Sequence, residues 1–316
     1  MSHIVNYLDK YPVILQEINN SSTNVLNLPV FVINLDSDKY RRGYIKFVMK
    51  RMNLNYTLVI VKQISEQVAK QITSVRKSVA GCCLSHLWCI RNAILKSHSH
   101  FLILEDDIVF HKNFLNLIKR VNYTNYDMVQ LGGCDFNLRS NLGENTNKND
   151  FRIYHPTKNA LGAYGNIYNI GFAKMLLNQK ITNFNEFDVN MHIFYKKYQI
   201  GVCYPNLITS ELSTSNLGHK FSVFDAKNKR YTNNCHINFD YGDYDFIWVI
   251  FLEYCFEQYT ANNNILNDYE ILVSKFTEKI GKCNEEINKV LLSNNYTHDD
   301  ILEIMKIYSS DKIRTK

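Results

Sequence analysis

Residues 28–61 alternate between two kinds of hydrophobic pattern, and this alternation constrains the fold more than any other feature of the sequence. Residues 28–35 (LPVFVINL) are a short, β-branched apolar run followed by the polar residues 36–38, as expected of a buried strand that leads into a helix cap. Across residues 40–54 the apolar side chains recur at helical spacing between lysines and arginines. Residues 56–61 then predict a second strand, which completes a βαβ-like unit.

A later apolar run ends in three consecutive acids. Residues 82–98 predict an amphipathic helix that leads into residues 101–104 (FLIL), which are typical of a central parallel strand buried on both faces. Glu105, Asp106 and Asp107 follow at the carboxyl end of this strand, where open parallel sheets bind their ligands. Three acids alone could also form a solvated turn. The apolar residues on both sides, however, would pull the acids inward unless a cation compensated them.

Adjacent carboxylates of this kind suit a hard divalent cation. Mn²⁺ or Mg²⁺ keeps some water and phosphate ligands, so one or two protein carboxylates suffice to hold it. We expect Glu105 and Asp107, alternating along an extended segment, to be the metal ligands, with Asp106 facing the other way or reaching the ribose of a nucleotide. Such a cation would stabilise the charge that grows on a diphosphate when a sugar leaves a nucleotide.

The remaining pattern predicts an α/β fold in which a Rossmann-type mixed sheet is flanked by helices and followed by a helical C-terminal tail. Residues 128–131 and 162–170 look like strands, residues 171–177 and 185–198 like helices, and residues 137–150 like a polar loop. We expect an N-terminal extension (1–29), a catalytic domain (30–240) and a helical region packed on it (241–316). Within the catalytic domain, about residues 30–135 would bind the nucleotide that donates a group, and about residues 136–240 would bind the molecule that accepts it.

Composition argues against several classes of function. The chain has 36 Lys+Arg against 30 Asp+Glu, and its net charge of +6 is too mild and too evenly spread for a nucleic-acid stripe. Residues 1–34 lack a signal-peptide profile, and residues 246–256 are too short to span a bilayer, which takes about 20 residues. The eight cysteines form no CxxC pair. We therefore expect a cytoplasmic protein with reduced thiols, no membrane span and no nucleic-acid partner.

Three blocks of residues carry a resemblance to a known family. They are Val32-Ile33-Asn34-Leu35 with Arg41 or Arg42 downstream, Gly81-Cys82-Cys83-Leu84-Ser85-His86, and Leu102-Ile103-Leu104-Glu105-Asp106-Asp107. They are similar to the opening strand, the G-C-x-x-S-H signature and the L-I-x-E-D-D metal and donor motif of glycosyltransferase family 25. That family includes lipooligosaccharide sugar transferases and collagen hydroxylysine galactosyltransferases. The resemblance covers about residues 30–220 and implies a GT-A-like fold.

The resemblance implies a hexosyltransferase that moves galactose or glucose from a UDP-sugar to a hydroxyl of a glycan. The acceptor could also be a hydroxylated or glycosylated lysine of a collagen-like protein. Asp36 stands where the family usually has an arginine, and the acceptor-side blocks are degraded, so the donor sugar and the acceptor stay open. Inverting and retaining outcomes also stay open. A more distant resemblance, to the glycosyltransferase domains of collagen lysyl hydroxylases, implies acidic metal ligands joined by a late histidine.

The remaining candidate residues would bind the donor or activate the acceptor. Donor binding is expected of residues near the first strand, the second block and a late loop, which are Asn34, Leu35, Asp36, Arg42, Ser85, Asp106 and Lys220. His219 would complete the metal shell. Asp188 is the first candidate for the base that deprotonates an acceptor hydroxyl, with Asp135 in reserve. In a retaining transfer Asp188 would instead orient the acceptor.

Several of these assignments have plain structural alternatives. Asp36 could be a helix N-cap, Arg42 could lie on a solvated helix face, and His219-Lys220 could be an exposed loop pair. Cys82, His86 and Cys89 fall at i, i+4 and i+7 and permit a zinc hypothesis, but a fourth ligand is not evident and buried free cysteine is common.

Two other functions compete with catalysis of sugar transfer. The first is a non-catalytic protein that binds nucleotide sugars or glycans with the same fold. The second is a metal-dependent phosphohydrolase, which would require further acids or histidines at strand ends for a two-metal site.

Overall fold

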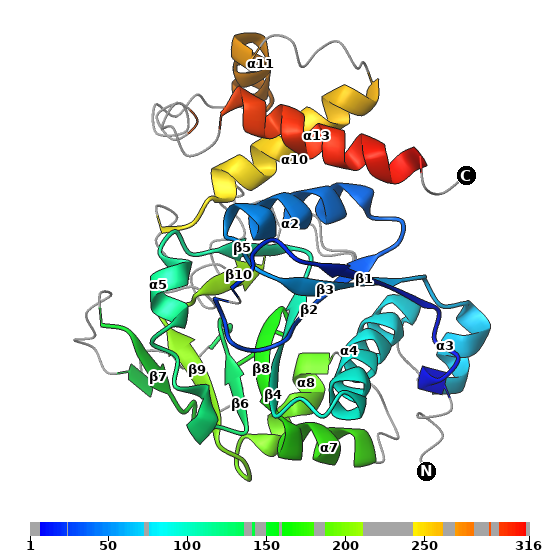
Figure 1. The fold of residues 1–316 in the computed structure, drawn as a ribbon, viewed down its shortest axis with the longest axis vertical. Coiled ribbons are helices and arrows are strands. Elements are labelled where there is room, and N and C mark those ends of the chain that lie inside the picture. The colour runs from blue at the N-terminus through cyan, green and yellow to red at the C-terminus, as the bar shows by residue number, and fades with distance from the viewer. Residues whose placement is uncertain are drawn as a thin grey trace.

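The computed structural model describes residues 7–23, 25–72, 76–135, 141–142, 150–157, 160–179, 187–210, 243–261, 269–280, 291 and 297–313. Its centre is an eight-stranded sheet with the order β1-β3-β2-β4-β8-β6-β9-β7. Helices cover both faces of this sheet, and the C-terminal helices form a further layer beyond α2 (Figure 1). The predicted α/β class, a mixed sheet flanked by helices, is therefore confirmed.

The large sheet contains both parallel and antiparallel pairs of strands. Their bounds are β1 Val13–Ile18, β2 Val30–Leu35, β3 Tyr56–Val61, β4 His100–Glu105, β6 Met128–Gln130, β7 Arg152–Tyr154, β8 Gly165–Asn169 and β9 Ile200–Tyr204. Strands β3, β2 and β4 are parallel, whereas β8 runs antiparallel between β4 and β6. Because β6 therefore points the same way as β4, the carboxyl ends of β2, β4 and β6 meet at one edge of the sheet.

A second, two-stranded sheet reaches this edge. It pairs β5 (Ile108–Phe110) with β10 (Ile208–Ser210) in antiparallel register, so that Ser210 lies opposite Ile108. Strand β5 begins directly after the acidic triplet, and β10 lies about 100 residues further along the chain. This long-range pairing brings a segment that sequence analysis left unassigned to the acids.

Side chains of successive residues on the central strands face opposite layers, as the two-residue period of a strand requires. On β2, Val30 and Val32 pack with the layer of α2 (Lys39–Arg51), whereas Phe31 and Ile33 pack with α4 (Lys77–Leu95) and α7 (Ile170–Asn178). The continuous apolar runs in the sequence thus reflect strands that are buried on both faces.

The smaller helices complete the two layers. They are α3 (Glu66–Ile72), α5 (Phe114–Ile118), α8 (Phe187–Met191) and the 3-10 turns η1 (Tyr123–Asn125) and η2 (His192–Phe194). The single helix expected over residues 185–198 is wrong, because α8 ends at Met191 and tighter turns follow it. Residues 137–150 fall mostly outside the described residues.

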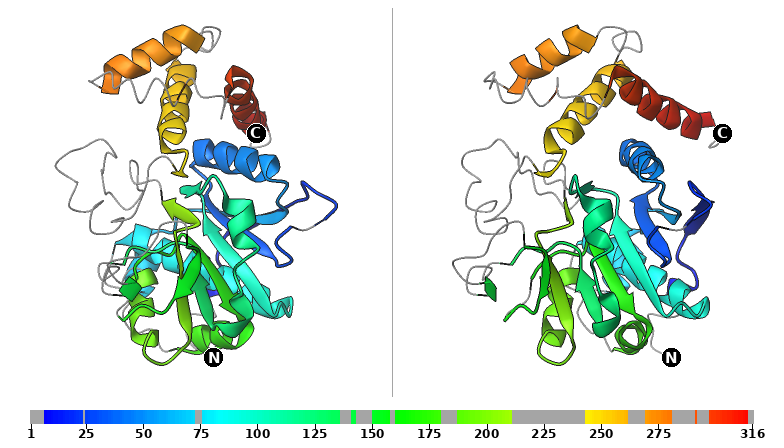
Figure 2. Two further views of the ribbon diagram at one scale, coloured as in Figure 1. Left: turned by 90° about the vertical axis from the view of Figure 1, so that its left-hand side faces the viewer. Right: turned by 60° about the vertical axis from the view of Figure 1, so that its left-hand side comes forward.

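The C-terminal region shares the core of the sheet domain. Its helices are α10 (Phe246–Ala261), α11 (Tyr269–Ile280) and α13 (His298–Ile313). Trp248, Phe251 and Ile301 are fully buried and belong to the same apolar cluster as α2 and β2. Two further views show α10 and α13 beyond α2 on one side of the molecule (Figure 2). At the other end of the chain, β1 pairs with β3 at the sheet edge, so part of the expected N-terminal extension joins the same sheet.

Candidate functional site

The acidic triplet occupies a turn at the carboxyl edge of the sheet. Glu105 is the last residue of β4, and Asp106 and Asp107 form the turn before β5. The expected extended alternation of Glu105 and Asp107 is therefore replaced by a turn, because β5 leaves the large sheet to pair with β10. The three carboxylates consequently point toward different neighbours.

Asp106 faces β2 and the first turn of α2. Its Oδ2 accepts a hydrogen bond of 2.6 Å from the Asn34 side-chain amide, which also donates to the Asp38 carbonyl. Its Oδ1 lies 3.5 Å from a guanidinium nitrogen of Arg41. Asp38 caps α2 by accepting from the Arg41 backbone N–H, which places this arginine at the acids. Asp106 is thus held from two sides in a buried position.

Asp107 faces the second sheet, and only one of its two carboxylate oxygens accepts a hydrogen bond from the described residues. Ser210 of β10 donates a hydrogen bond of 3.0 Å to Oδ2, and the same Arg41 guanidinium lies 3.9 Å from Oδ2. The other oxygen, Oδ1, is buried and has no hydrogen-bond partner among the described residues. A buried carboxylate oxygen of this kind is costly unless a cation or a donor from outside approaches it.

Glu105 faces α4, where the second family-like block lies. Its Oε1 is 2.9 Å from His86 Nε2 and 3.7 Å from the Cys82 sulfur. The His86 ring is fully buried and stacks on Phe187 of α8, with 4.4 Å between the ring centroids. The Glu105 side chain keeps 26% of its surface exposed, so it remains accessible from solvent.

The electrostatic setting disfavours the ionised forms of Asp106 and Asp107. Burial raises the pKa of Asp106 to about 7, although the Arg41 guanidinium opposes this shift. Burial also raises the pKa of Asp107, Arg41 again lowers it, and the neighbouring Glu105 carboxylate adds to the increase. Because a divalent cation would stabilise the ionised carboxylates, the residues present fit a hard metal ion such as Mn²⁺ or Mg²⁺.

Asp188 lies beside this cluster. Burial raises its pKa, and the Glu105 charge contributes to the increase. Its two oxygens accept hydrogen bonds from the backbone N–H groups of Gly162 (2.9 Å) and Val189 (2.8 Å). Gly162 has a φ of 133°, a conformation that favours glycine, so Asp188 also fixes an unusual backbone turn.

Asp135, the reserve candidate, is more deeply enclosed. It is 1% exposed, and its Oδ2 accepts hydrogen bonds from Asn141 (2.6 Å) and the Tyr154 hydroxyl (3.1 Å). Asp188 lies within electrostatic reach of Glu105, whereas Asp135 is hydrogen-bonded to Asn141 and Tyr154. Geometry thus favours Asp188 over Asp135 as the acid near the triplet.

The donor-binding candidates separate into two groups. Asn34, Leu35 and Asp36 lie at the carboxyl end of β2, next to the triplet, as expected. Arg42 instead donates to the Asp36 carbonyl at 2.9 Å and pairs with its carboxylate, so it fixes the β2–α2 turn. Ser85 is bonded to Tyr11 and to the Gly81 carbonyl.

The guanidinium at the acids therefore belongs to Arg41. Sequence analysis missed both this role and that of Ser210. The spacing from Leu35 to the arginines admits both Arg41 and Arg42, and β10 gave no periodic signal. His219 and Lys220, the late-loop candidates, lie outside the described residues.

The zinc hypothesis named Cys82, His86 and Cys89 as ligands, and it is wrong for Cys89. Cys82 and His86 do face the same point, but the third nearby ligand atom belongs to Glu105. Cys89 is fully buried and packs in the apolar cluster between α4 and the sheet. Helical spacing alone could not show that the last residue of β4, Glu105, lies next to Cys82 and His86.

The cysteines correct one further expectation. Cys82, Cys83, Cys89, Cys203 and Cys255 are free, whereas Cys134 is disulfide-bonded. The expectation of reduced thiols throughout is therefore wrong for Cys134. Spacing along the chain carried no sign of this bond, because it depends on which segments the fold brings together.

Helix α4 is long and apolar enough to cross a membrane by length and composition. Of its most apolar window, however, 56% is buried inside the protein, as is common for the core helix of a globular fold.

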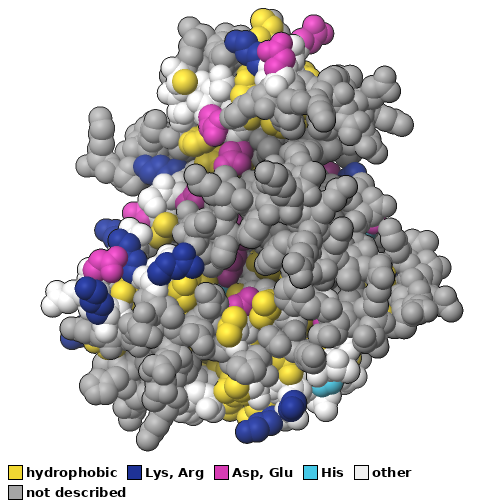
Figure 3. All heavy atoms as spheres, turned by 180° about the vertical axis from the view of Figure 1, so that it is seen from behind, with side chains coloured by type: hydrophobic (Ala, Val, Ile, Leu, Met, Phe, Trp, Pro, Cys, Tyr) yellow, Lys and Arg dark blue, Asp and Glu magenta, His cyan; other side chains and the backbone are white. Residues whose placement is uncertain are grey.

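On the face seen in Figure 3, lysines and arginines are dispersed among acidic and apolar side chains.

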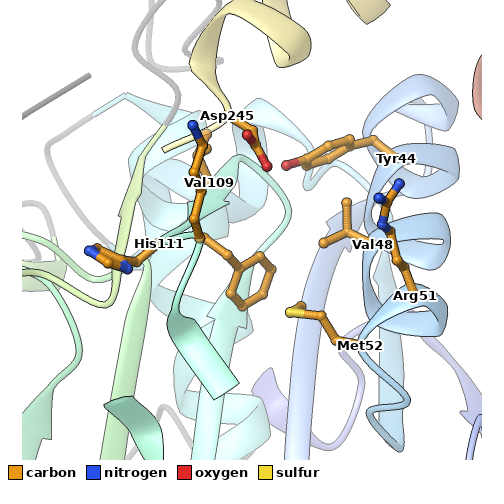
Figure 4. A pocket seen from close by; sticks show the side chains of 9 residues that line it. Tyr44, Val48, Arg51, Met52, Val109, His111 and Asp245 are labelled. Carbon is orange, nitrogen blue, oxygen red and sulfur yellow. The ribbon is translucent and has the colours of Figure 1, made fainter. Parts of the chain in front are cut away.

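A separate pocket of about 320 Å³ lies between α2, β5 and the start of α10. Tyr44 and Asp245 point toward each other across it, and Arg51 and Met52 line its α2 side (Figure 4). None of the three acids of the triplet lines this pocket. It is therefore distinct from the acidic site.

Comparison with known proteins identifies the segment that contains the acidic site. Residues 27–179 match the family described as glycosyltransferase family 25 (LPS biosynthesis protein). No curated protein sequence matches the chain. Among the matching solved structures, "Crystal Structure of A197 from STIV" is 14% identical, with a TM-score of 0.33 over 55% of this chain and 81% of that chain. The family match suggests glycosyltransferase activity. Residues 27–179, which hold the acidic triplet and the strands beside it, are thus similar to glycosyltransferase family 25.

Proposed function

We propose that the protein is a metal-dependent hexosyltransferase that uses a UDP-sugar as donor. The sugar, galactose or glucose, would pass to a hydroxyl of a glycan or of a hydroxylated or glycosylated lysine in a collagen-like protein. The observation that carries this proposal is the crowding of Glu105, Asp106 and Asp107 at the carboxyl edge of the sheet, with one oxygen of Asp107 buried and unbonded among the described residues.

Glu105 and Asp107 are the proposed ligands of Mn²⁺ or Mg²⁺. Each offers a carboxylate oxygen, the ligand type that these hard cations prefer. A bound cation would neutralise the charge that develops on the leaving diphosphate. Arg41 holds Asp106 and Asp107 in place and adds positive charge at the same point. His219 is proposed as a further ligand and Lys220 as a phosphate contact, from the sequence alone.

The donor nucleoside is proposed to bind at the carboxyl end of β2. Asn34 is fixed by its bonds to Asp106 and to the Asp38 carbonyl, and the side chain of Asp36 is 36% exposed. These residues lie beside the triplet, so a nucleoside held here would place its diphosphate near Glu105 and Asp107. This is the crevice in which open α/β sheets bind nucleotides.

Asp188 is the proposed base for the acceptor hydroxyl in an inverting transfer. Its raised pKa brings a carboxylate closer to the range in which it accepts a proton efficiently near neutral pH. Its two backbone hydrogen bonds hold the carboxylate in one orientation. In a retaining transfer the same carboxylate would orient the acceptor.

Thermal unfolding with nucleotides and metals tests this proposal. UDP should raise the melting temperature more than GDP or ADP, and strongly only with Mn²⁺ or Mg²⁺. A ligand at 100 times its dissociation constant adds about 2.7 kcal/mol to the free energy of unfolding, which such a measurement resolves. Asp107→Asn should remove the metal-dependent part of the effect, whereas the exposed control Asp299→Asn should keep it.

The outcomes separate the competing functions. Equal stabilisation by UDP in the presence of a chelator would contradict the metal role. Metal-dependent UDP binding without hydrolysis of UDP-galactose or UDP-glucose, and without transfer to any acceptor, would favour a non-catalytic nucleotide-sugar-binding protein.

A further inference from the structure

A second set of possible metal-ligand atoms lies on the side of Glu105 that faces α4. The Cys82 sulfur, His86 Nε2 and a Glu105 carboxylate oxygen all lie within 4.8 Å of one another. Cys82 and His86 are four residues apart on α4, so they project from the same helix face. Glu105 approaches this face from the end of β4, with contacts of 3.7 Å to the sulfur and 2.9 Å to the imidazole nitrogen.

The chemistry of this set differs from that of the acidic turn. A thiolate, an imidazole and a carboxylate are the three ligand types that zinc uses, whereas Mg²⁺ and Mn²⁺ prefer oxygen. The local charge also favours a cation, because Glu105, Asp188 and Asp107 all lie within electrostatic reach of the Cys82 thiol. The described residues provide no fourth His, Cys, Asp or Glu within this set.

The set is both rigid and reachable. The His86 ring is buried and stacked on Phe187, so its position changes little when a metal arrives. The Glu105 side chain is 26% exposed and leaves a path for an ion from solvent. Three protein ligands with one position left open is the arrangement of zinc sites that also hold water or a ligand.

We propose that Cys82, His86 and Glu105 form a binding site for a thiophilic divalent cation of the zinc class, with an open fourth position. Zinc bound here occupies Glu105, and so it competes with a hard cation for that carboxylate. The competition rests on the proposed function, which assigns Glu105 to the Mn²⁺ or Mg²⁺ site. Zinc binding itself does not depend on that assignment.

Cobalt provides the test, because Co²⁺ takes zinc sites and reports a thiolate ligand through a charge-transfer band in the near ultraviolet. We expect the full-length protein to show this band with Co²⁺ and to lose it when Zn²⁺ is added. Cys82→Ser should abolish the band, and His86→Gln should weaken Co²⁺ and Zn²⁺ binding at least about 100-fold. Even outer-sphere partners of zinc ligands are worth 10- to 100-fold in affinity.

Cys89→Ser is the matched control, since Cys89 lies on the same helix but packs in the apolar cluster. It should keep the cobalt band. Glutamine at position 86 can still donate to Glu105, so His86→Gln tests the site even if Cys82→Ser unfolds. A wild-type protein without the band, or a band that survives Cys82→Ser in folded protein, would overturn the proposal.

A competition experiment separates this proposal from the proposed function. Titration of Mn²⁺ in the presence of saturating Zn²⁺ should show weaker Mn²⁺ binding than in its absence. If zinc binds through Cys82 and His86 and leaves Mn²⁺ binding unchanged, the zinc site stands and the assignment of Glu105 to the hard-cation site is contradicted.

Discussion

At the scale of single residues, the buried acids make stability depend on pH. The pKa of Asp106 is raised from 3.8 to about 7 by burial, so the folded protein keeps a proton that the unfolded chain has already lost. Between about pH 4 and pH 7 the native state therefore binds more protons, and the free energy of unfolding falls as pH rises. A bound metal ion would favour the ionised acids and oppose this fall.

We predict that the metal-free protein loses on the order of 2–4 kcal/mol of stability between pH 4.5 and pH 7.5, from Asp106 and Asp107 together. Denaturant unfolding in a chelator across this pH range measures the loss. Asp106→Asn, which resembles the protonated acid, should flatten the profile, and Mn²⁺ should reduce the slope for the wild type. An unchanged slope in Asp106→Asn would show that this carboxyl is not the group that titrates.

Asp188 allows a second prediction at this scale. Asp188→Asn should lower sugar transfer by about 10²- to 10⁴-fold, because an amide cannot accept the acceptor proton. It should also cost about 1–3 kcal/mol of stability, since its NH₂ group cannot accept the hydrogen bond that one carboxylate oxygen now receives. UDP affinity in the presence of Mn²⁺ should remain. Normal transfer would place the base elsewhere, with Asp135 as the next candidate, and loss of UDP binding would make Asp188 a donor-site residue.

At the scale of elements, the site depends on how closely β10 packs against the end of β6. Gly132 follows β6, and a Cβ at this position would lie 1.9 Å from the Ile208 carbonyl oxygen of β10. A hydrogen bond from the Leu207 N–H to the Leu131 carbonyl also holds the residue before β10 against the end of β6. Strand β10 carries Ser210 to Asp107, so this close approach sets the position of a site residue.

We predict that Gly132→Ala lowers stability by about 1–3 kcal/mol or more, because backbone atoms must move to make room. It should also weaken Mn²⁺ binding as Ser210 shifts. Gly81→Ala is the control: its Cβ meets nothing within 4 Å and lies inside α4, so it should add about 0.5–1 kcal/mol. Thermal unfolding and Mn²⁺ titration of both variants check these effects. Equal stability of the two variants would contradict the close packing at Gly132.

At the scale of the whole molecule, the C-terminal helices are held to the sheet domain by apolar packing more than by charge. Helix α13 lies against α2, where Lys50 pairs with Glu303 at 2.6 Å and Arg51 with Asp300 at 3.4 Å on the exposed side. Beneath these pairs Ile304 is 1% exposed within the main apolar cluster. Exposed ion pairs contribute little because water screens them, whereas buried methyl groups contribute more.

We therefore predict that Ile304→Ala costs about 2–5 kcal/mol and that the adjacent Glu303→Ala costs less than about 1 kcal/mol. Denaturant unfolding should show one cooperative transition for both variants if the C-terminal helices and the sheet share one core. A separate early transition in Ile304→Ala would show instead that the helical region unfolds on its own.

The sequence by itself determined the parallel half of the fold and the place of the acids. Strands β2, β3 and β4 are short continuous apolar runs, because both of their faces are buried, and helices α2 and α4 carry helical periods, because each buries one face against the core. Once β4 was recognised as a buried strand, Glu105, Asp106 and Asp107 had to lie at its carboxyl end, the edge at which open parallel sheets bind ligands.

Only the tertiary structure decided which residues meet at those acids. Strands β5, β7 and β10 have three residues each, too few to show a period, and their partners lie far along the chain. Arg41, and not Arg42, reaches the acids because of the direction in which α2 leaves its cap. Ser210 contacts Asp107 because β5 and β10 pair across about 100 residues. The meeting of Cys82 and His86 with Glu105 likewise required α4 to pack against the end of β4. Such contacts arise from long-range packing, which local sequence patterns do not encode.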